Sequence, residues 1–222
     1  MNDLSLEFKS NLQKLFIEKK FSELEIEIES LGDIENLPEN IFYLYAVSKS
    51  LNPHSKKKDL ILATDILVKL YYNNKKNLEP LYNLVVVSLK ARTYKKTLKI
   101  LNEAFKENPK DEKIIDGLAK FNYILANIDE AYKYYKLLFE VNPHQILSRN
   151  SFLTLLNYCP SVTQNEYIEQ CKIYTNLIEK NLNDNFIFNK NHKQKIKLGF
   201  FSSDFKKHSV SYFIKDLINN ID

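Results

Sequence analysis

The sequence predicts an all-α tetratricopeptide-repeat solenoid, followed by one strand–loop–helix unit of the α/β type. Three observations support this prediction. The chain of 222 residues contains only 3 Gly and 6 Pro, whereas loop-rich and all-β folds need many such turn residues. Pro109 and Pro143 lie 34 residues apart, which is the length of one helix–turn–helix repeat of this class. From Lys195 onward the pattern changes from helical to extended.

The composition indicates a folded protein with a packed core. Hydrophobic residues make up 44% and aromatic residues 13% of the chain, which argues against general disorder. The net charge of +4 combines many charges of both signs. The basic cluster at residues 56–58 is interpreted as a solvated loop, because nucleic-acid-binding faces show a stronger imbalance of charge. Nucleic acid is therefore not a predicted partner.

The cysteines and the apolar runs predict neither a metal site nor a membrane segment. Cys159 and Cys171 form no CxxC pair, so neither structural zinc nor a disulfide framework is predicted. The N-terminal stretch "MNDLSLEFKSNLQKLFIEKK" has no apolar region of the signal-peptide kind. No apolar run approaches the roughly eighteen residues that cross a bilayer. We expect a cytoplasmic protein with no membrane partner.

Two successive repeats match in phase. Each proline follows an Asn at the end of an amphipathic run, in "FKENPKDEK" and "FEVNPHQIL". If Pro143 is the last position of one repeat, the unit begins at Glu112, and small Ala119 and Ala131 fall where its two helices approach each other. Proline then ends the second helix, because it lacks an N–H donor and clashes with the preceding turn. The preceding unit has these residues at matching places: Leu81, Leu84, Leu101 and Ala104.

Two further helical pairs are predicted upstream, where the period is less regular. The stretch "LSLEFKSNLQKLFIEKKFSELEIEIESLGD" predicts a first pair that ends near Gly32. The stretch "ENIFYLYAVSKSLNPHSKKKDLILATDILVKLYYNNKK" predicts a second pair with a polar connection at residues 53–58. Terminal repeats of a solenoid differ from the others because they cover the core. Residues 1–145 are expected to form about four hairpins in a right-handed curved array, and residues 146–190 a helical connector.

The predicted function of such an array is to bind proteins or peptides in the groove along its concave face. Asn83 is the candidate substrate-binding residue, because it directly precedes Leu84 on the first helix of its repeat and would hold a peptide backbone in the groove. The alternative is a solvated Asn in an Asn-rich sequence. The next repeat has Gly117 at the matching place, so no continuous ladder of asparagines is predicted.

The C-terminal stretch "KIKLGFFSSDFKKHSVSYFIKDLINNID" predicts different local structure. Residues 195–201 form an apolar strand in this interpretation, and residues 202–207 form the connecting loop. Ser209 is the expected N-cap of a helix that starts at Val210. Loops at the carboxyl ends of strands hold ligands in open α/β sheets, and a helix N-terminus at such a place favours anionic groups.

Two segments resemble a known family. The stretch "SRNSFLTLLNYCPSVTQNEYIEQCKIY" resembles the segment that follows the repeats in bacterial and plant-type relatives of O-GlcNAc transferase. The stretch "KIKLGFFSSDFKKHSVSYFIKDL" resembles the opening of the catalytic domain in the same family 41 of glycosyltransferases. The matching positions are Leu198, Gly199, Phe200, Ser202, Asp204, Phe205, His208, Ser209 and Val210.

The resemblance implies a fold, a reaction and site residues. The family has two α/β lobes and transfers N-acetylglucosamine or another sugar from a UDP-sugar to protein side chains. His208 matches a histidine at the active-site cleft, so it is the candidate catalytic residue, either as the base or as an active-site loop residue that caps the helix. Ser202 and Asp204 are the candidate substrate-binding residues, with Asp204 expected to hold the loop by accepting backbone N–H bonds. Ser209 replaces the Pro of many relatives, and Tyr212 replaces a His of the animal forms.

The same resemblance implies that residues 191–222 are only the start of a catalytic domain. No glycine-rich phosphate loop is predicted, because Gly32, Gly117 and Gly199 lie far apart. We therefore expect an N-terminal fragment of a glycosyltransferase whose repeats present the protein substrate, inactive alone and without a cofactor in this chain. The complete enzyme would use a UDP-sugar donor. The alternative is a stand-alone repeat adaptor that binds proteins.

Overall fold

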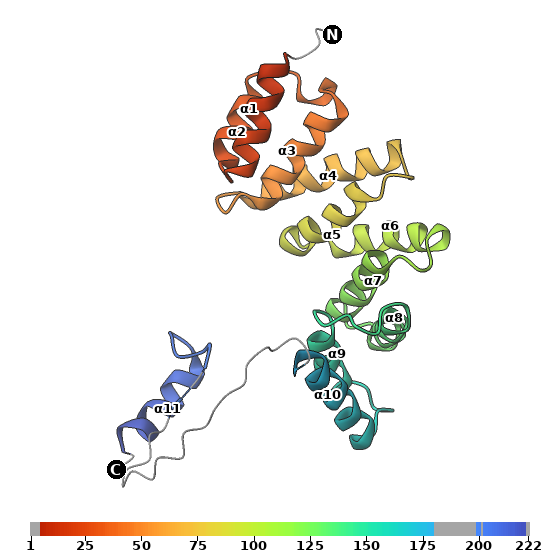
Figure 1. Ribbon diagram of the computed structural model, residues 1–222, viewed down its shortest axis with the longest axis vertical. Coiled ribbons are helices and arrows are strands. Elements are labelled where there is room, and N and C mark those ends of the chain that lie inside the picture. Colours follow the sequence, from red (N-terminus) through yellow and green to blue (C-terminus); the bar gives the residue numbers. More distant parts are fainter. Residues whose placement is uncertain (1–4, 180–198, 201, 221–222) are drawn as a thin grey trace. The chain divides into compact units, whose positions relative to one another are not determined.

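The computed structural model describes residues 5–179, 199–200 and 202–220. The chain divides into two compact units, Met1–Leu182 and Asn183–Asp222. The first unit is a succession of antiparallel helical pairs, which follow one another from α1 to α10 in Figure 1. Its helices are α1 (Leu6–Ile17), α2 (Phe21–Glu29), α3 (Glu39–Leu51), α4 (Lys57–Asn73), α5 (Glu79–Ala91), α6 (Tyr94–Glu107), α7 (Glu112–Ile124), α8 (Ile128–Val141), α9 (Arg149–Leu156) and α10 (Gln164–Glu179), with a short 3-10 helix, η1 (Ile34–Asn36), before α3.

The four predicted hairpins are confirmed over the described part of residues 1–145. The helix α7 begins at Glu112 as the proline spacing predicted, and its N-cap Asp111 accepts the backbone N–H of Ile114 at 2.9 Å. The helices α6 and α8 each end two residues before Pro109 and Pro143. The first pair ends before Gly32, which has a φ of 87°, a backbone conformation that glycine adopts without strain.

Small residues allow the close approach of helices that the sequence predicted. Ala119 of α7 and Ala131 of α8 are fully buried in one core cluster. Gly117 lies so close to α5 and α6 that an added Cβ would be 3.1 Å from side-chain atoms of Val85 and of Leu101. A larger side chain at this position would push these helices apart.

The predicted connector packs onto the fourth helical pair. Phe152 of α9 is 1% exposed, and its ring lies 5.7 Å from that of Tyr135 and 5.3 Å from that of Phe139, between ring centroids. The guanidinium of Arg149 lies over the Phe139 ring at 4.1 Å. Because α9 is helical but does not follow the 34-residue pattern, the sequence indicated its helicity without indicating this contact.

Tyrosines on one helix donate hydrogen bonds to carboxylates on another along the whole first unit. These bonds are Tyr45–Glu29 (2.6 Å), Tyr72–Glu103 (2.9 Å), Tyr82–Asp111 (2.6 Å) and Tyr132–Glu166 (2.8 Å). Burial, followed by the bond to its carboxylate, raises the pKa of Tyr45 and of Tyr132 to about 12. Each bond joins residues of two different helical pairs, or of a pair and the following connector, so the four bonds help to fix how successive units are stacked.

The second unit contains α11 (Ser209–Asn219), which confirms the predicted helix, and residues 202–207 form turns and bends as predicted. The N-cap is His208 rather than the predicted Ser209: the Nδ1 atom of His208 accepts the backbone N–H of Val210 at 3.3 Å. The predicted strand falls on residues 195–198 and 201, which lie outside the described residues, and on Gly199 and Phe200, which have no regular structure. The described part of the chain contains no strand and no helix that is both long and apolar enough to cross a membrane.

Replacing Phe152 by Ala should destabilise the first unit by about 3–5 kcal/mol, because it leaves a cavity among three aromatic rings. The measurement is urea unfolding followed by circular dichroism. Tyr158→Ala is the matched control, since Tyr158 is 60% exposed and its loss should change the free energy of unfolding by less than about 0.5 kcal/mol. An unchanged unfolding midpoint for Phe152→Ala would show that α9 does not pack on the array.

The protein should lose stability in alkaline solution between about pH 10 and pH 12. The pKa of Tyr45 and of Tyr132 is raised in the folded state, so the folded state holds these protons more tightly and its advantage is complete below the unfolded pKa of about 10. Thermal unfolding at a series of pH values measures this dependence. The double variant Tyr45→Phe/Tyr132→Phe should be less stable at neutral pH and should show a shallower alkaline decline; an unaltered decline would contradict the assignment.

Candidate functional site

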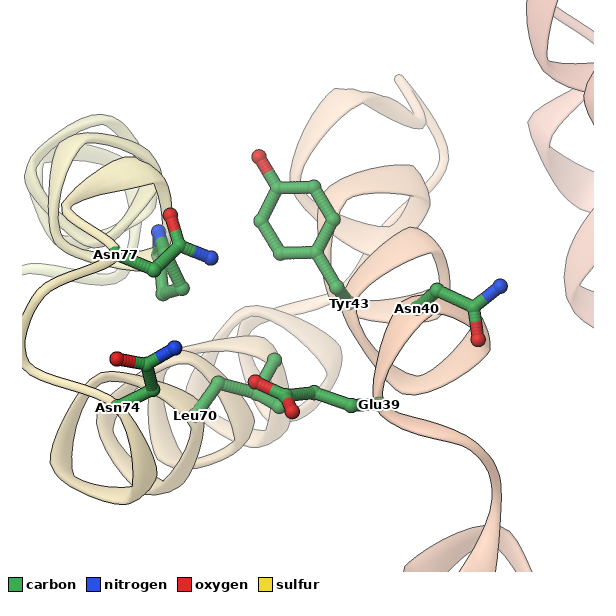
Figure 2. A pocket seen from close by; sticks show the side chains of 7 residues that line it. Glu39, Asn40, Tyr43, Leu70, Asn74 and Asn77 are labelled. Atoms are coloured by element: carbon green, nitrogen blue, oxygen red, sulfur yellow. The ribbon is translucent and has the colours of Figure 1, made fainter.

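A hollow of about 490 Å³ lies where the start of α3, the end of α4 and the start of α5 meet. Its lining is mixed polar and apolar, and consists of Glu39, Asn40, Tyr43, Leu70, Asn74, Asn77 and Pro80. Figure 2 shows Asn74 and Asn77 on one side, facing Glu39 and Tyr43 on α3, while Asn40 points away from them. The hollow therefore presents amide groups and a phenol beside an apolar floor.

The amides of this hollow are only partly used by the protein itself. The Asn77 side-chain oxygen accepts the backbone N–H of Glu79 at 3.1 Å, which orders the turn into α5 and leaves its NH2 group available. The side chain of Asn74 forms no hydrogen bond with any described residue, and it is exposed. A side-chain amide has two donor hydrogens and an acceptor oxygen, so the pair offers both kinds of group to a ligand.

Asn83 lies beside the hollow and positions Tyr43, one of the lining residues. The Nδ2 atom of Asn83 donates to the Tyr43 hydroxyl at 2.7 Å and to the backbone oxygen of Glu79 at 3.1 Å. Burial, and then the charge of Glu79, raise the pKa of Tyr43, so its hydroxyl stays protonated and can donate to a ligand. The Asn83 amide oxygen remains as the group that could accept a peptide N–H, which is half of the role that the sequence predicted.

Further polar contacts join the first helices of successive pairs. The Lys90 ammonium on α5 donates to the backbone oxygen of Ser50 on α3 at 2.5 Å. On the other side of α5, Tyr82 donates to Asp111, and the Lys113 ammonium lies over the Tyr82 ring at 4.1 Å. These contacts hold α3, α5 and α7 in a fixed row. The hollow is therefore bounded by helices whose mutual positions do not depend on a ligand.

The remaining predicted site residues lie together in the second unit. Ser202 accepts the backbone N–H of Asp204 on its hydroxyl at 3.0 Å, and the Nδ1 atom of His208 is 3.9 Å from the Asp204 carboxylate. Because Nδ1 accepts the N–H of Val210, the neutral imidazole has its proton on Nε2. The expected hydrogen bonds from backbone N–H groups to the Asp204 carboxylate are not present among the described residues. The loop thus holds these three residues together, with His208 as the helix cap.

Neither the hollow nor the described part of the C-terminal loop contains a metal site. Among the described residues, no group of three or more His, Cys, Asp or Glu is arranged to hold an ion. Both cysteines are free, with Cys159 buried. Burial raises the pKa of the Cys159 thiol, which makes it a poor nucleophile.

The sequence did not indicate Glu39, Tyr43, Asn74 and Asn77 as site residues. Tyr43 and Asn83 are both the fifth residue of their helices, because α3 begins at Glu39 and α5 at Glu79. These starts are 40 residues apart, so a search at a period of 34 does not pair them. The run "YYNNKKN" is the one local signal, since asparagines favour turns and gather here at the junction of two helices.

Solved structures of MamA resemble this chain over about four fifths of its length. The structure described as the MamA RS-1 ArsTM double mutant has a TM-score of 0.67 at 14% sequence identity, and the match covers 80% of this chain and 96% of that one. The structure named MamA MSR-1 C2 gives 0.62 at 14% identity, with 79% and 97% covered. A third, MamA 41-end from Desulfovibrio magneticus RS-1, gives 0.62 at 12% identity, with 80% and 96% covered.

This likeness establishes the fold class of the helical part. MamA is a tetratricopeptide-like, all-helical protein, so the tetratricopeptide-like fold is confirmed for this chain. No protein-family model matches the sequence, and no curated protein matches it significantly.

Proposed function

We propose that the helical array binds an extended peptide segment of a partner protein, and that the hollow between α3, α4 and α5 holds part of its backbone. One observation supports this most directly: Asn74 and Tyr43 line the same hollow, and the Asn74 amide has no partner among the described residues. The tetratricopeptide-like fold is compatible with this role, because its rows of first helices form extended binding surfaces.

The chemistry of the hollow fits a peptide backbone. Each peptide unit has one N–H donor and one C=O acceptor, and the amides of Asn74 and Asn77 supply the complementary groups. The Glu39 carboxylate adds an acceptor, and Leu70 supplies an apolar surface for one side chain of the ligand. A nucleotide is less well served, because the lining has no cation for a phosphate.

Replacing Asn74 by Ala should weaken peptide binding about three- to tenfold, since each lost hydrogen bond contributes on the order of 1 kcal/mol. The probes are peptides selected from a random twelve-residue display library on residues 1–222, with affinities then measured by isothermal titration calorimetry. Asn73→Ala is the matched control, because Asn73 is the exposed neighbouring residue at the end of α4 and does not line the hollow.

Two outcomes contradict the peptide proposal. Either no peptide is enriched on the wild-type chain, or the selected peptides bind the Asn74→Ala and Asn73→Ala variants with equal affinity. Thermal unfolding of the two variants should coincide, because neither side chain is buried.

A second candidate function rests on the C-terminal loop. The resemblance of "LGFFSSDFKKHSV" to the family 41 glycosyltransferases favours an array that presents protein substrates to a UDP-sugar-dependent transferase. Ser202, Asp204 and His208 lie close together on one loop, and the Nε2 atom of His208 is not used by the helix cap. In this proposal a neutral His208 with its proton on Nε2 acts as an active-site loop residue, and the base role would need the other tautomer.

Residues 1–222 alone should transfer no sugar from UDP-N-acetylglucosamine to acceptor proteins. The full translated product of the gene should transfer it, and His208→Ala should lower kcat, because the imidazole caps the helix and orders the active-site loop. The measurement is incorporation of radiolabelled sugar into a protein mixture. Ser209→Ala is the control on the same helix end. Turnover by residues 1–222, or none by the full product, would overturn this candidate and leave the adaptor function.

A further inference from the structure

The start of α6 carries a basic hollow that is separate from the peptide site. Two adjoining cavities of about 380 Å³ and 490 Å³ share Lys95 and Leu125 as lining residues. Together they are lined by Arg92, Thr93, Tyr94, Lys95, Lys96, Leu98, Lys99, Asn102, Leu125 and Asn127, a set that contains four cations and no carboxylate. We call this surface the basic hollow.

Three of its four cations have no acidic partner among the described residues. Lys96 forms an ion pair with Asp65 at 2.7 Å, whereas no ion pair is present for Arg92, Lys95 or Lys99 in the described part of the chain. Lys95 and Lys99 are one helical turn apart, and like charges at this spacing repel each other. The chain has a net charge of only +4, so this grouping is not a consequence of a generally basic surface.

The start of α6 has no negative charge to balance these cations. No acidic residue occupies the first turn of α6, in contrast to α2, α4 and α8, although α9 and α11 also lack one. Thr93 is at the N-cap position without a side-chain cap bond, and its hydroxyl oxygen is buried with no hydrogen-bond partner. Cations at a helix N-terminus oppose helix formation. The lysines of the first turn and the missing cap bond both disfavour the start of this helix. An anion bound there would offset both effects.

We propose that the basic hollow binds a carboxylate-rich segment of a protein. The three unpaired cations surround a partly apolar floor formed by Leu98 and Leu125, which suits the methylene groups of Glu side chains. A nucleic acid is disfavoured, since such ligands commonly engage about six to ten cations and stack their bases on free aromatic faces. Tyr94 lines the hollow but packs against Phe121, with 5.9 Å between ring centroids.

The basic hollow and the peptide site lie at opposite ends of one helix. Pro80 lines the peptide hollow at the start of α5, and Arg92 follows the last residue of the same helix. The two residues are twelve positions apart along the helix, which corresponds to about 18 Å. The binding of an acidic segment can therefore be tested separately from peptide binding at Asn74, because the two sites share no lining residue.

The test uses residues 1–222 and two fluorescein-labelled peptides, one with a run of glutamates and one with glutamines at the same positions. The glutamate peptide should bind at least about tenfold more tightly at low salt, and the difference should shrink as salt screens the charges. The double variant Lys95→Gln/Lys99→Gln should weaken its binding about tenfold or more. Fluorescence anisotropy measures each affinity.

Two further variants separate the site from net charge and from misfolding. Lys57→Gln/Lys58→Gln removes the same charge from the first turn of α4 and should change the affinity by less than about twofold. Arg92 has a φ of 60°, a conformation that glycine adopts more readily, so Arg92→Gly should lose affinity without a lower melting temperature.

Equal losses in the two double variants, or equal binding of the two peptides, would overturn the proposal. So would a single-stranded oligonucleotide that binds more tightly than the glutamate peptide and depends on Lys95 and Lys99, because the ligand would then be a nucleic acid.

Discussion

The burial of two apolar faces on every helical pair is the constraint on which the rest of the structure depends. The helix α7 shows this most clearly. Ile114 and Leu118 lie in the core shared with the preceding pairs, whereas Ile115 and Ala119 lie in the core shared with α8 and α9. Full burial of one such large side chain contributes about 1.5–3 kcal/mol. A single hairpin leaves one of these faces in water, so each pair is stable only between neighbours.

The same constraint decides where polar groups can be used for binding. Both flanks of the interior pairs are covered, so free polar side chains remain on the outward helix faces and at the turns. The peptide hollow lies at the turn between α4 and α5, and the basic hollow at the turn between α5 and α6. Inter-helix bonds such as Tyr43–Asn83 and Tyr82–Asp111 use polar groups of the same row to fix the spacing of the first helices. Binding groups are thus presented on a scaffold that is already ordered.

Much of the fold could be predicted because the residues that determine it recur at a fixed period in the sequence. A proline at the end of each unit and small residues at its crossing point are local requirements, so Pro109, Pro143 and Ala119 indicated the helix bounds of two repeats. The strand of the second unit lies mostly outside the described residues and stays a prediction, as does the catalytic role of His208. The N-cap was wrong by one residue, since Ser is the commoner cap but the Nδ1 atom of His208 takes the N–H of Val210.

The candidate sites were harder to predict because their residues are neighbours only after stacking. Tyr43 and Asn83 occupy the same place in two helices, yet the longer second pair puts them 40 residues apart and hides the relation from a search at a period of 34. Asn83 alone was predicted, as a ligand group, and its N–H groups are in fact used on Tyr43 and Glu79. The cations of α6 were not indicated as site residues by the sequence. They line cavities that contain no carboxylate, and this arrangement is visible only in the folded chain.

Local stability explains how the array can tolerate an unfavourable charge pattern at α6. This helix buries Thr97, Ile100, Leu101 and Ala104, and the Thr97 hydroxyl is paired with that of Ser88 on α5 at 2.6 Å. In a repeat array each unit contacts only its neighbours, so the effect of repelling cations stays within α5, α6 and α7. The buried apolar face of α6 stabilises the helix. Its opposite face can therefore carry lysines that do not stabilise the helix but are available to bind a ligand.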